Sequence, residues 1–243
     1  MNATTTDSQR VAMVTGASRG IGRAVAIALA EQNIHILLLA RTQGGLEEVY
    51  DEIVNAGGEA TGVPMDLTDY EAIDRLGGVI AERWGKLDIF VGNAGILGPI
   101  SPVAHMKPDE FEKTLAINVT ANARLIRALE PLLLASDNGR AVFLTSGAAY
   151  STKPFWCAYS TSKAALDALV KSWANEQKNT ALKINLYSPG PVRTAMRAQA
   201  MPGENPSTLP TAEDIAPQIL SLCSPDYLET GDIIPKRLSL IHI

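Results

Sequence analysis

The sequence predicts an α/β fold in which one parallel β-sheet is covered by helices on both faces. Short apolar runs rich in Val, Ile and Leu alternate with amphipathic segments along the 243-residue chain, and this alternation is typical of parallel strands joined by helices. No internal repeat or low-complexity linker interrupts it, so we expect a single domain over residues 1–243. Polar residues and glycines follow several apolar runs, at the strand ends where such sheets bind ligands.

The composition restricts the possible functions. The chain is 46% hydrophobic and 19% charged, and its net charge of −5 offers no basic field for nucleic acid. No apolar run approaches the roughly 18 residues of a membrane span, so we expect no membrane partner. The two cysteines lie far apart and the three histidines are scattered, which predicts a cytoplasmic protein without a metal site. Residues 1–9 are polar, lack a signal region and are expected to be disordered.

The first predicted strand, residues 11–14, is followed by the loop Thr-Gly-Ala-Ser-Arg-Gly-Ile-Gly at residues 15–22. A helical pattern then covers residues 23–31. Glycines in this context let the backbone approach a ligand, and the helix N-terminus attracts phosphate. The spacing is Gly-x-x-x-Gly-x-Gly, and such a loop also occurs as a plain strand-to-helix turn.

The second predicted strand, residues 34–40, is followed at once by Arg41. In dinucleotide-binding units a carboxylate near this position binds the ribose 2′-hydroxyl. An arginine suits a 2′-phosphate instead, and Arg19 in the glycine loop could reach the same group. NADP(H) is therefore favoured, with NAD(H) as the other candidate. The alternative is that Arg41 is only a solvated loop residue.

The third and fourth strands also end in polar residues. After a helix over residues 46–56, the third strand covers residues 60–65. Asp66 follows it, where it could accept a hydrogen bond from adenine or, like Thr68, cap the helix over residues 70–84.

Beyond the fourth strand, residues 87–91, the small residues Gly-Asn-Ala-Gly at 92–95 leave room for a ring or ribose, or form a plain turn. A long helical pattern then covers residues 107–134, with Asn118 among apolar residues. A buried amide needs partners, so Asn118 either bonds neighbouring backbone or holds a water.

The fifth predicted strand, residues 141–145, leads into the segment that carries the candidate chemistry. Ser146 lies at the strand end, and a helical pattern extends from about residue 157 to 177. Tyr159 and Lys163 are four residues apart and therefore share one helix face. A phenol, an ammonium and a hydroxyl can thus converge on one carbonyl group.

The C-terminal part begins with a strand over residues 182–187 and the breaking sequence Ser-Pro-Gly-Pro-Val-Arg-Thr at 188–194. Residues 195–210 are rich in Met and Pro and have no clear element, so we predict a mobile substrate loop. A Thr-x-x-Asp capping box opens a helix over residues 211–223. A short final strand is predicted at residues 231–234.

Together these motifs resemble the short-chain dehydrogenase/reductase family, in its single-domain branch, from residue 10 to about residue 231. The resemblance rests on the glycine loop at 15–22, Asn-Ala-Gly at 93–95, Asn118 in Ile-Asn-Val, Ser146, Tyr159-x-x-x-Lys163, and Pro-Gly-Pro-Val-x-Thr at 189–194. One Tyr-x-x-x-Lys is a weak signal, whereas six motifs in order, each at the right element end, are specific.

The resemblance implies a three-layer, Rossmann-type, doubly wound parallel sheet of about seven strands in a homodimer or homotetramer. It implies an NAD(P) cofactor and hydride transfer to or from the carbonyl or alcohol carbon of a small molecule. The implied catalytic set is Ser146, Tyr159 and Lys163, with Asn118 completing a proton relay. The implied cofactor-binding residues are Gly16, Ser18, Arg19, Gly20, Ile21, Arg41, Asp66, Leu67, Asn93, Ala94, Gly95, Tyr159, Lys163, Pro189, Gly190, Val192 and Thr194.

The implied chemistry suits these residue types. Carbonyl reduction builds negative charge on oxygen and needs a proton donor and an electrostatic stabiliser. A phenol has a pKa of about 10, and we expect Lys163 and the positive charge of oxidised nicotinamide to lower that of Tyr159. Ser146 would orient the carbonyl. An apolar substrate is suggested by the candidate pocket residues Leu97, Ala148, Phe155, Trp156, Met196 and Met201.

Two features depart from the family pattern. Ala148 stands where relatives often carry a second hydroxyl, and the tail at residues 235–243 lacks the usual glycine-containing ending. For the tail, a cloning scar, a truncated or misread end, and a real variation all stay open.

Two other functions are alternatives for this sequence. One is a catalytically silent NADP-binding regulatory or scaffold protein, which need not keep Ser146, Tyr159 and Lys163. The other is a sugar-nucleotide epimerase or dehydratase, which usually requires a substrate domain. Too few residues follow Thr194 to form one.

Overall fold

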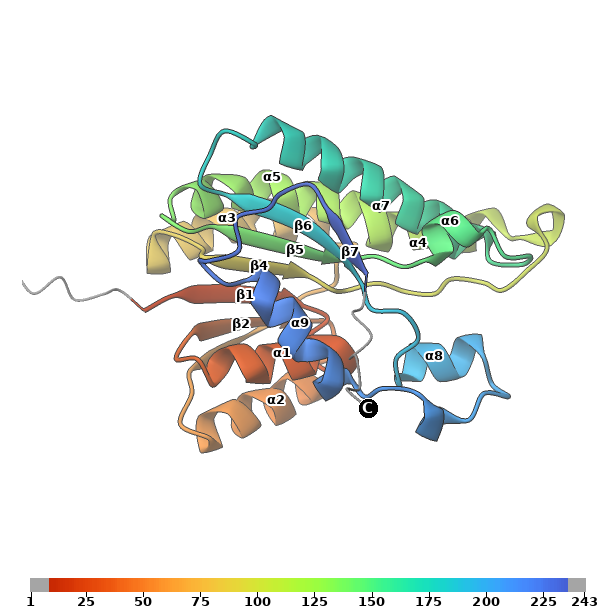
Figure 1. The fold of residues 1–243 in the computed structure, drawn as a ribbon, viewed down its shortest axis with the longest axis horizontal. Coiled ribbons are helices and arrows are strands. Elements are labelled where there is room, and N and C mark those ends of the chain that lie inside the picture. Colours follow the sequence, from red (N-terminus) through yellow and green to blue (C-terminus); the bar gives the residue numbers. More distant parts are fainter. Residues whose placement is uncertain (1–8, 236–243) are drawn as a thin grey trace, which may run out of the picture.

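The structure, a computed structural model, describes residues 9–235. It contains a seven-stranded sheet of order β3-β2-β1-β4-β5-β6-β7, in which every neighbouring pair is parallel. Helices cover both faces (Figure 1), which confirms the predicted three-layer, doubly wound fold. The N-terminal segment predicted to be disordered, except for residue 9, and the atypical tail beyond residue 235 lie outside the described residues.

The strand bounds lie within two residues of those predicted from the sequence. Strands β1, β4 and β5 are buried at every position, as expected for parallel strands with helices on both sides. The edge strand β3 is only partly buried. The strands are β1 (Val11–Thr15), β2 (His35–Ala40), β3 (Ala60–Pro64), β4 (Ile89–Gly92), β5 (Arg140–Leu144), β6 (Lys183–Ser188) and β7 (Ile233–Pro235).

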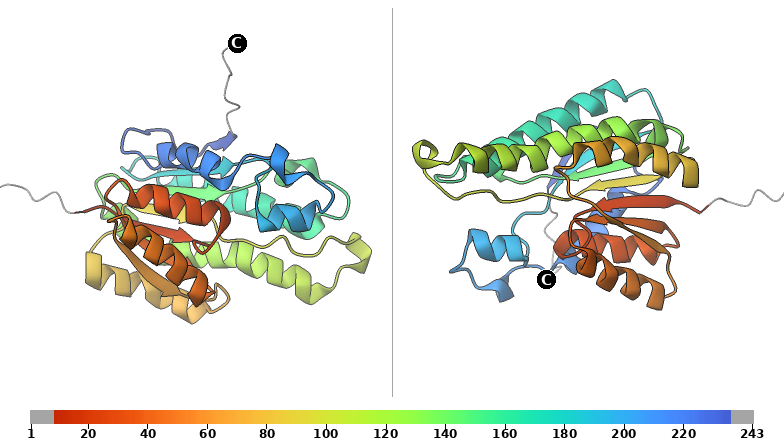
Figure 2. Two further views of the ribbon diagram at one scale, coloured as in Figure 1. Left: turned by 90° about the horizontal axis from the view of Figure 1, so that it is seen from below. Right: turned by 180° about the vertical axis from the view of Figure 1, so that it is seen from behind.

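The helices divide into two layers, which Figure 1 and the two further views in Figure 2 show on opposite sides of the sheet. One layer contains α1 (Gly20–Ala30), α2 (Gln43–Asn55) and α9 (Ala212–Leu222). The other contains α3 (Tyr70–Trp84), α4 (Pro108–Leu115), the π-helical turn η2 (Ala116–Thr120), α5 (Ala121–Leu134) and α7 (Cys157–Glu176). Shorter pieces are η1 (Val103–His105), α6 (Ala148–Ser151), α8 (Ala195–Ala200) and η3 (Pro206–Thr208).

Alternate strand residues supply the two hydrophobic cores. In β1, Ala12 and Val14 pack toward α1, α2 and α9, whereas Val11 and Met13 pack toward α3, α5 and α7. This alternation follows from the two-residue period of a strand, and it explains why the central strands are apolar throughout. Within residues 9–235, no helix combines the length and the apolar content that a membrane crossing requires.

The predicted substrate loop, residues 195–210, is not without structure. It contains α8 and η3, so the prediction of no clear element was wrong. Thr194 caps α8 by accepting a hydrogen bond from the Arg197 amide at 3.2 Å, and the Arg197 guanidinium binds both carboxylate oxygens of Glu204 at 2.6 Å. Arg193 adds bonds to the carbonyls of Pro206 and Leu209. These contacts stabilise a helix too short to give an apolar repeat.

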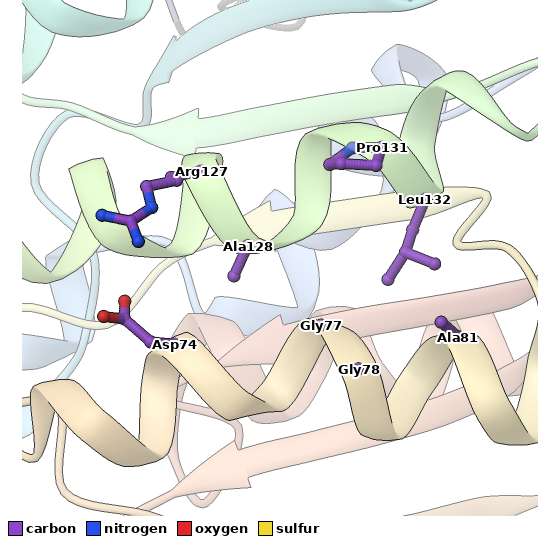
Figure 3. Close-up of a pocket in the computed structure, with 8 residues that line it drawn as sticks. All are labelled: Asp74, Gly77, Gly78, Ala81, Arg127, Ala128, Pro131 and Leu132. Carbon is purple, nitrogen blue, oxygen red and sulfur yellow. The ribbon is translucent and has the colours of Figure 1, made fainter.

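Helices α3 and α5 approach each other closely at Gly77. A Cβ atom built there would lie 2.3 Å from the carbonyl oxygen of Ala128 in α5. Figure 3 shows both residues beside a surface pocket between the two helices, whose lining residues are distinct from the predicted site residues. Glycine at position 77 is therefore a packing requirement.

We predict that Gly77→Ala destabilises the protein by about 1–3 kcal/mol, because the new methyl group forces α3 away from α5. The matched control is Gly78→Ala, where a Cβ atom meets nothing within 4 Å and the higher helix propensity of alanine adds up to about 1 kcal/mol of stability. Urea unfolding of both variants measures the difference. Equal effects of the two substitutions would contradict the close contact.

Candidate active site

The predicted site residues gather at the carboxyl ends of the strands. Gly16 follows β1, Asp66 follows β3, Asn93 follows β4, Ser146 follows β5 and Pro189 follows β6. The strand order reverses at β1, which lies between β2 and β4, and a ligand crevice forms at such a point. Helices α6 and α8 lie beyond this edge of the sheet (Figure 1).

The glycine loop is held against the end of β4. Asn93 donates from Nδ2 to the carbonyls of Thr15 at 2.8 Å and Gly16 at 3.3 Å, while Thr15 Oγ1 accepts from the amides of Asn93 and Ala94 at 3.0 Å. A Cβ atom on Gly16 would lie 2.8 Å from Asn93 Nδ2, and one on Gly22 would lie 2.3 Å from the Gly16 carbonyl oxygen. The glycines are therefore needed for this packing, and Asn93 shapes the loop directly.

The start of α1 forms a cradle for an anion. Gly16 and Gly20 have positive φ angles of 66° and 58°, Arg19 is the N-cap, and the first turn is Gly-Ile-Gly. Such a helix start presents N–H groups and a positive dipole end. A Cβ atom on Gly20 would lie 3.5 Å from Thr194 Cγ2, so the segment after β6 borders the same cradle. The geometry fits a phosphate-bearing cofactor.

Two exposed arginines lie near the cradle: Arg19 at the start of α1 and Arg41 directly after β2. Arg19 and Arg41 are both exposed, and Arg41 Nη1 lies 4.0 Å from Asp66 Oδ2. Asp66 accepts hydrogen bonds from the Thr68 amide and hydroxyl at 2.8 Å. These bonds, more than the nearby Arg41 charge, hold the pKa of Asp66 below its usual value. The capping alternative for Asp66 and Thr68 is wrong, because Asp69 caps α3 by accepting from Ala72 N at 2.9 Å.

Asn118 belongs to the π-helical turn η2, and both ends of its side-chain amide form hydrogen bonds. Its Oδ1 accepts from the Ile96 amide at 2.8 Å, and its Nδ2 donates to the Ile96 carbonyl at 2.8 Å and to Ser162 Oγ at 2.9 Å. A Cβ atom on Gly95 would lie 3.2 Å from Asn118 Oδ1 and 3.8 Å from Lys163 Nζ. Asn118 therefore bonds neighbouring backbone, and it joins the segment after β4 to α7.

Ser146, Tyr159 and Lys163 are brought together as the sequence predicts. The hydroxyl of Ser146 lies close enough to Tyr159 to act on the pKa of its phenol. The ammonium of Lys163 lies 5.7 Å from the Tyr159 ring centre and donates to the carbonyl of Leu144 at 2.7 Å. Lys163 is only 4% exposed. A hydroxyl, a phenol and a buried amine thus share one small volume at the end of β5.

Burial dominates the protonation of these groups. It raises the pKa of Tyr159, and the neighbouring hydroxyl of Ser146 opposes this rise only in part. Burial also lowers the pKa of Lys163 to about 8, against the opposing charge of Asp167. The direction for Tyr159 is the reverse of the sequence-based expectation, which considered neighbouring charges but not desolvation.

The remaining predicted residues border the same edge. Val192 is buried, and Gly190 has a positive φ of 67° in the turn that leads to Thr194. The candidate substrate residues differ in exposure. Leu97 and Ala148 are buried, whereas Phe155 and Met201 are exposed. Among the described residues, no three His, Cys, Asp or Glu side chains gather as metal ligands would.

Sequence reasoning missed one buried acid at the site. Asp167 lies one helical turn after Lys163 on α7 and is 4% exposed. It accepts hydrogen bonds from Thr145 and Tyr150, which flank Ser146. The i, i+4 spacing of Lys163 and Asp167 was the signal in the sequence that could have revealed it.

Comparison with known proteins identifies the family. The short chain dehydrogenase family model matches residues 10–205. The oxidoreductase YciK of Escherichia coli (strain K12) is 36% identical over 222 residues, which are 90% of this chain and 88% of YciK. A 3-oxoacyl-[acyl-carrier-protein] reductase of Synechocystis sp. is 31% identical over 188 residues, 77% of this chain and 76% of that protein.

A solved structure of a short chain dehydrogenase from Escherichia coli CFT073, complexed with NADPH, superimposes with a TM-score of 0.89. It is 35% identical in sequence, and the match covers 93% of this chain and 95% of that one. The seven-stranded sheet, the matched family model and these relatives agree. The chain belongs to the short-chain dehydrogenase family of oxidoreductases.

Proposed function

We propose that this protein is an NADP(H)-dependent carbonyl reductase or alcohol dehydrogenase. The observation that carries the proposal is the cluster at the end of β5, where the hydroxyl of Ser146 neighbours the phenol of Tyr159 and the buried amine of Lys163 lies 5.7 Å from the centre of the phenol ring. This cluster combines a proton donor with groups that stabilise negative charge on oxygen. It lies at the strand edge that also holds the glycine cradle.

The cofactor assignment is supported by the charges around the cradle. The pyrophosphate would bind the glycine loop and the start of α1. Arg41 would bind a 2′-phosphate, because its guanidinium is exposed and has only a 4.0 Å contact with Asp66. Arg19 lies exposed in the adjacent loop. The relative from Escherichia coli CFT073 is complexed with NADPH, which favours the same cofactor here over NAD(H).

In the proposed reaction, the glycine cradle would hold NADPH, which would supply a hydride to the carbonyl carbon of the substrate. Ser146 donates a hydrogen bond to the carbonyl oxygen and orients it. Tyr159 gives its proton to that oxygen as negative charge develops, and the Lys163 ammonium stabilises the resulting phenolate. Lys163 would also hold the nicotinamide ribose. Asn118 holds the segment after β4 beside Lys163, and this position next to the Lys163 amine supports its proposed part in a proton relay.

The protonation states favour reduction near neutral pH. Because burial raises the pKa of Tyr159, the phenol is protonated and available as a donor. Oxidation of an alcohol requires the phenolate as a base, so it is favoured at higher pH. The substrate class within this reaction is a small carbonyl compound. The Synechocystis relative is a 3-oxoacyl reductase, so 3-oxoacyl thioesters belong in the first substrate panel.

A catalytically silent NADP-binding protein of the same fold is the alternative. Such a protein would bind NADPH but would not need the hydroxyl of Ser146 beside the phenol of Tyr159. Turnover separates the two functions, since both predict cofactor binding.

We predict that the purified protein oxidises NADPH when supplied with a panel of ketones and 3-oxoacyl thioesters, and that Tyr159→Phe abolishes this turnover. The substitution removes the proton donor but keeps the ring, so the NADPH dissociation constant should change less than about threefold. Absorbance at the NADPH band and cofactor fluorescence measure the two quantities. Retained activity in Tyr159→Phe would contradict the mechanism, and binding without turnover across the panel would favour the silent protein.

We predict that Arg41→Ala weakens NADPH binding by about tenfold to a hundredfold, the range expected for the loss of a hydrogen bond between charged groups. NADH, which lacks the 2′-phosphate, should lose little affinity. The control is Arg75→Ala, which removes an exposed arginine of α3. Titration of cofactor fluorescence measures all affinities, and equal losses for both cofactors would remove the argument for a 2′-phosphate.

We predict that carbonyl reduction declines as pH rises through about 8. Lys163, with its pKa lowered from 10.5 to about 8, is charged below that pH and neutral above it, so stabilisation of the phenolate is lost. Among the described residues, the titratable groups near its amine are Tyr159, whose ring centre lies 5.7 Å away, and Asp167, whose charge raises its pKa. In Lys163→Arg the charge persists, so the remaining activity should stay level between pH 7 and 9. A decline at the same pH in Lys163→Arg would exclude Lys163 as its cause.

A further inference from the structure

A buried carboxylate lies behind the predicted catalytic set. Asp167 is 4% exposed and belongs to α7, the helix that carries Tyr159 and Lys163. The hydroxyl of Thr145 donates to its Oδ1, and the phenol of Tyr150 donates to its Oδ2 at 2.6 Å. Both carboxylate oxygens therefore have a hydroxyl donor, as a buried acid requires.

The two donors flank the residue that orients the substrate. Thr145 immediately precedes Ser146, and Tyr150 lies in α6, four residues after it. One carboxylate thus attaches both sides of the Ser146 segment to α7. Because Tyr159 projects from the same helix, these two hydrogen bonds determine how Ser146 faces the phenol.

Asp167 also lies one helical turn from Lys163 on α7, and its negative charge acts on the Lys163 amine. The described groups around the Lys163 amine include the Tyr159 ring, whose centre lies 5.7 Å away, the carbonyl of Leu144, and the segment at Gly95 and Asn118. The one described ionised group that acts on its pKa is Asp167. Those facing Asp167 are Thr145, Tyr150 and Lys163. An ammonium this deeply buried needs a counter-charge to stay protonated.

We infer that Asp167 is a positioning residue for the proposed reaction, which fixes Ser146 opposite Tyr159 through Thr145 and Tyr150 and maintains the positive charge on Lys163. The inference rests on the proposed function. The carboxylate of Asp167 then has two separable tasks. Its hydrogen bonds position the Ser146 segment, and its negative charge acts on Lys163.

Two substitutions separate these tasks. Asp167→Asn removes the charge with little change of shape, whereas Tyr150→Phe removes one hydrogen bond and keeps the charge. The matched control is Asp137→Asn, an exposed carboxylate in the turn before β5, at the opposite edge of the sheet. Each protein is compared with the wild-type chain in thermal stability, in NADPH affinity from pH 6 to 9, and in kcat and KM.

In the wild-type protein, NADPH affinity should fall as Lys163 loses its proton near pH 8. In Asp167→Asn we expect this fall to move down by about one pH unit, because the opposing negative charge is gone. Tyr150→Phe should leave the binding curve unmoved and lower kcat about tenfold, since Ser146 is less well placed. Asp137→Asn should match the wild-type protein in every measurement.

If NADPH affinity depends on pH in the same way in Asp167→Asn and in the wild-type protein, the charge role is wrong. This holds even if thermal stability falls, because a merely structural carboxylate would change thermal stability alone. Full kcat in Tyr150→Phe would overturn the positioning role, and this variant decides if Asp167→Asn does not fold. A wild-type chain that reduces no carbonyl compound would remove the proposed function, while the binding curves would still decide whether Asp167 controls Lys163.

Discussion

The hydrogen bond between the Lys163 amine and the Leu144 carbonyl is the contact on which the site depends. It attaches α7 to the last residue of β5, 2.7 Å from nitrogen to oxygen, in a place closed to water. A sheet carbonyl can satisfy one proton of the amine but cannot balance its charge. The phenol of Tyr159 lies near the amine, and the carboxylate of Asp167 lies one helical turn away on α7. This arrangement follows from the need to keep a charged amine inside the protein.

The π-helical turn at Asn118 has a structural role comparable to that of the Lys163–Leu144 hydrogen bond, on the other side of the site. A regular α-helix would run from α4 into α5, but five residues adopt the wider turn instead. The amide of Asn118 then reaches both the backbone of Ile96 and the hydroxyl of Ser162. The helix thereby joins β4, through its following segment, to α7. Such turns are commonly found where a local irregularity places a functional group.

The sheet and the position of the site could be predicted from the sequence for a physical reason. Parallel strands buried on both faces are continuous apolar runs, and their carboxyl ends share an edge, so motifs after the runs had to gather there. Helix α8 was missed because a Thr194 cap and the Arg197–Glu204 pair stabilise it rather than an apolar repeat. The pKa direction of Tyr159 was wrong because desolvation depends on what surrounds a side chain, which no local pattern contains.

The segment from Arg193 to Pro210 has a consequence for how such a protein can change over evolutionary time. Its main polar contacts are internal: Arg193 bonds the carbonyls of Pro206 and Leu209, its amide bonds Pro210, and Arg197 pairs with Glu204. A segment that carries its own supports can be replaced or lengthened without disturbing the sheet. Sequence changes after Thr194, which itself borders the glycine cradle, can therefore be accommodated within this one module.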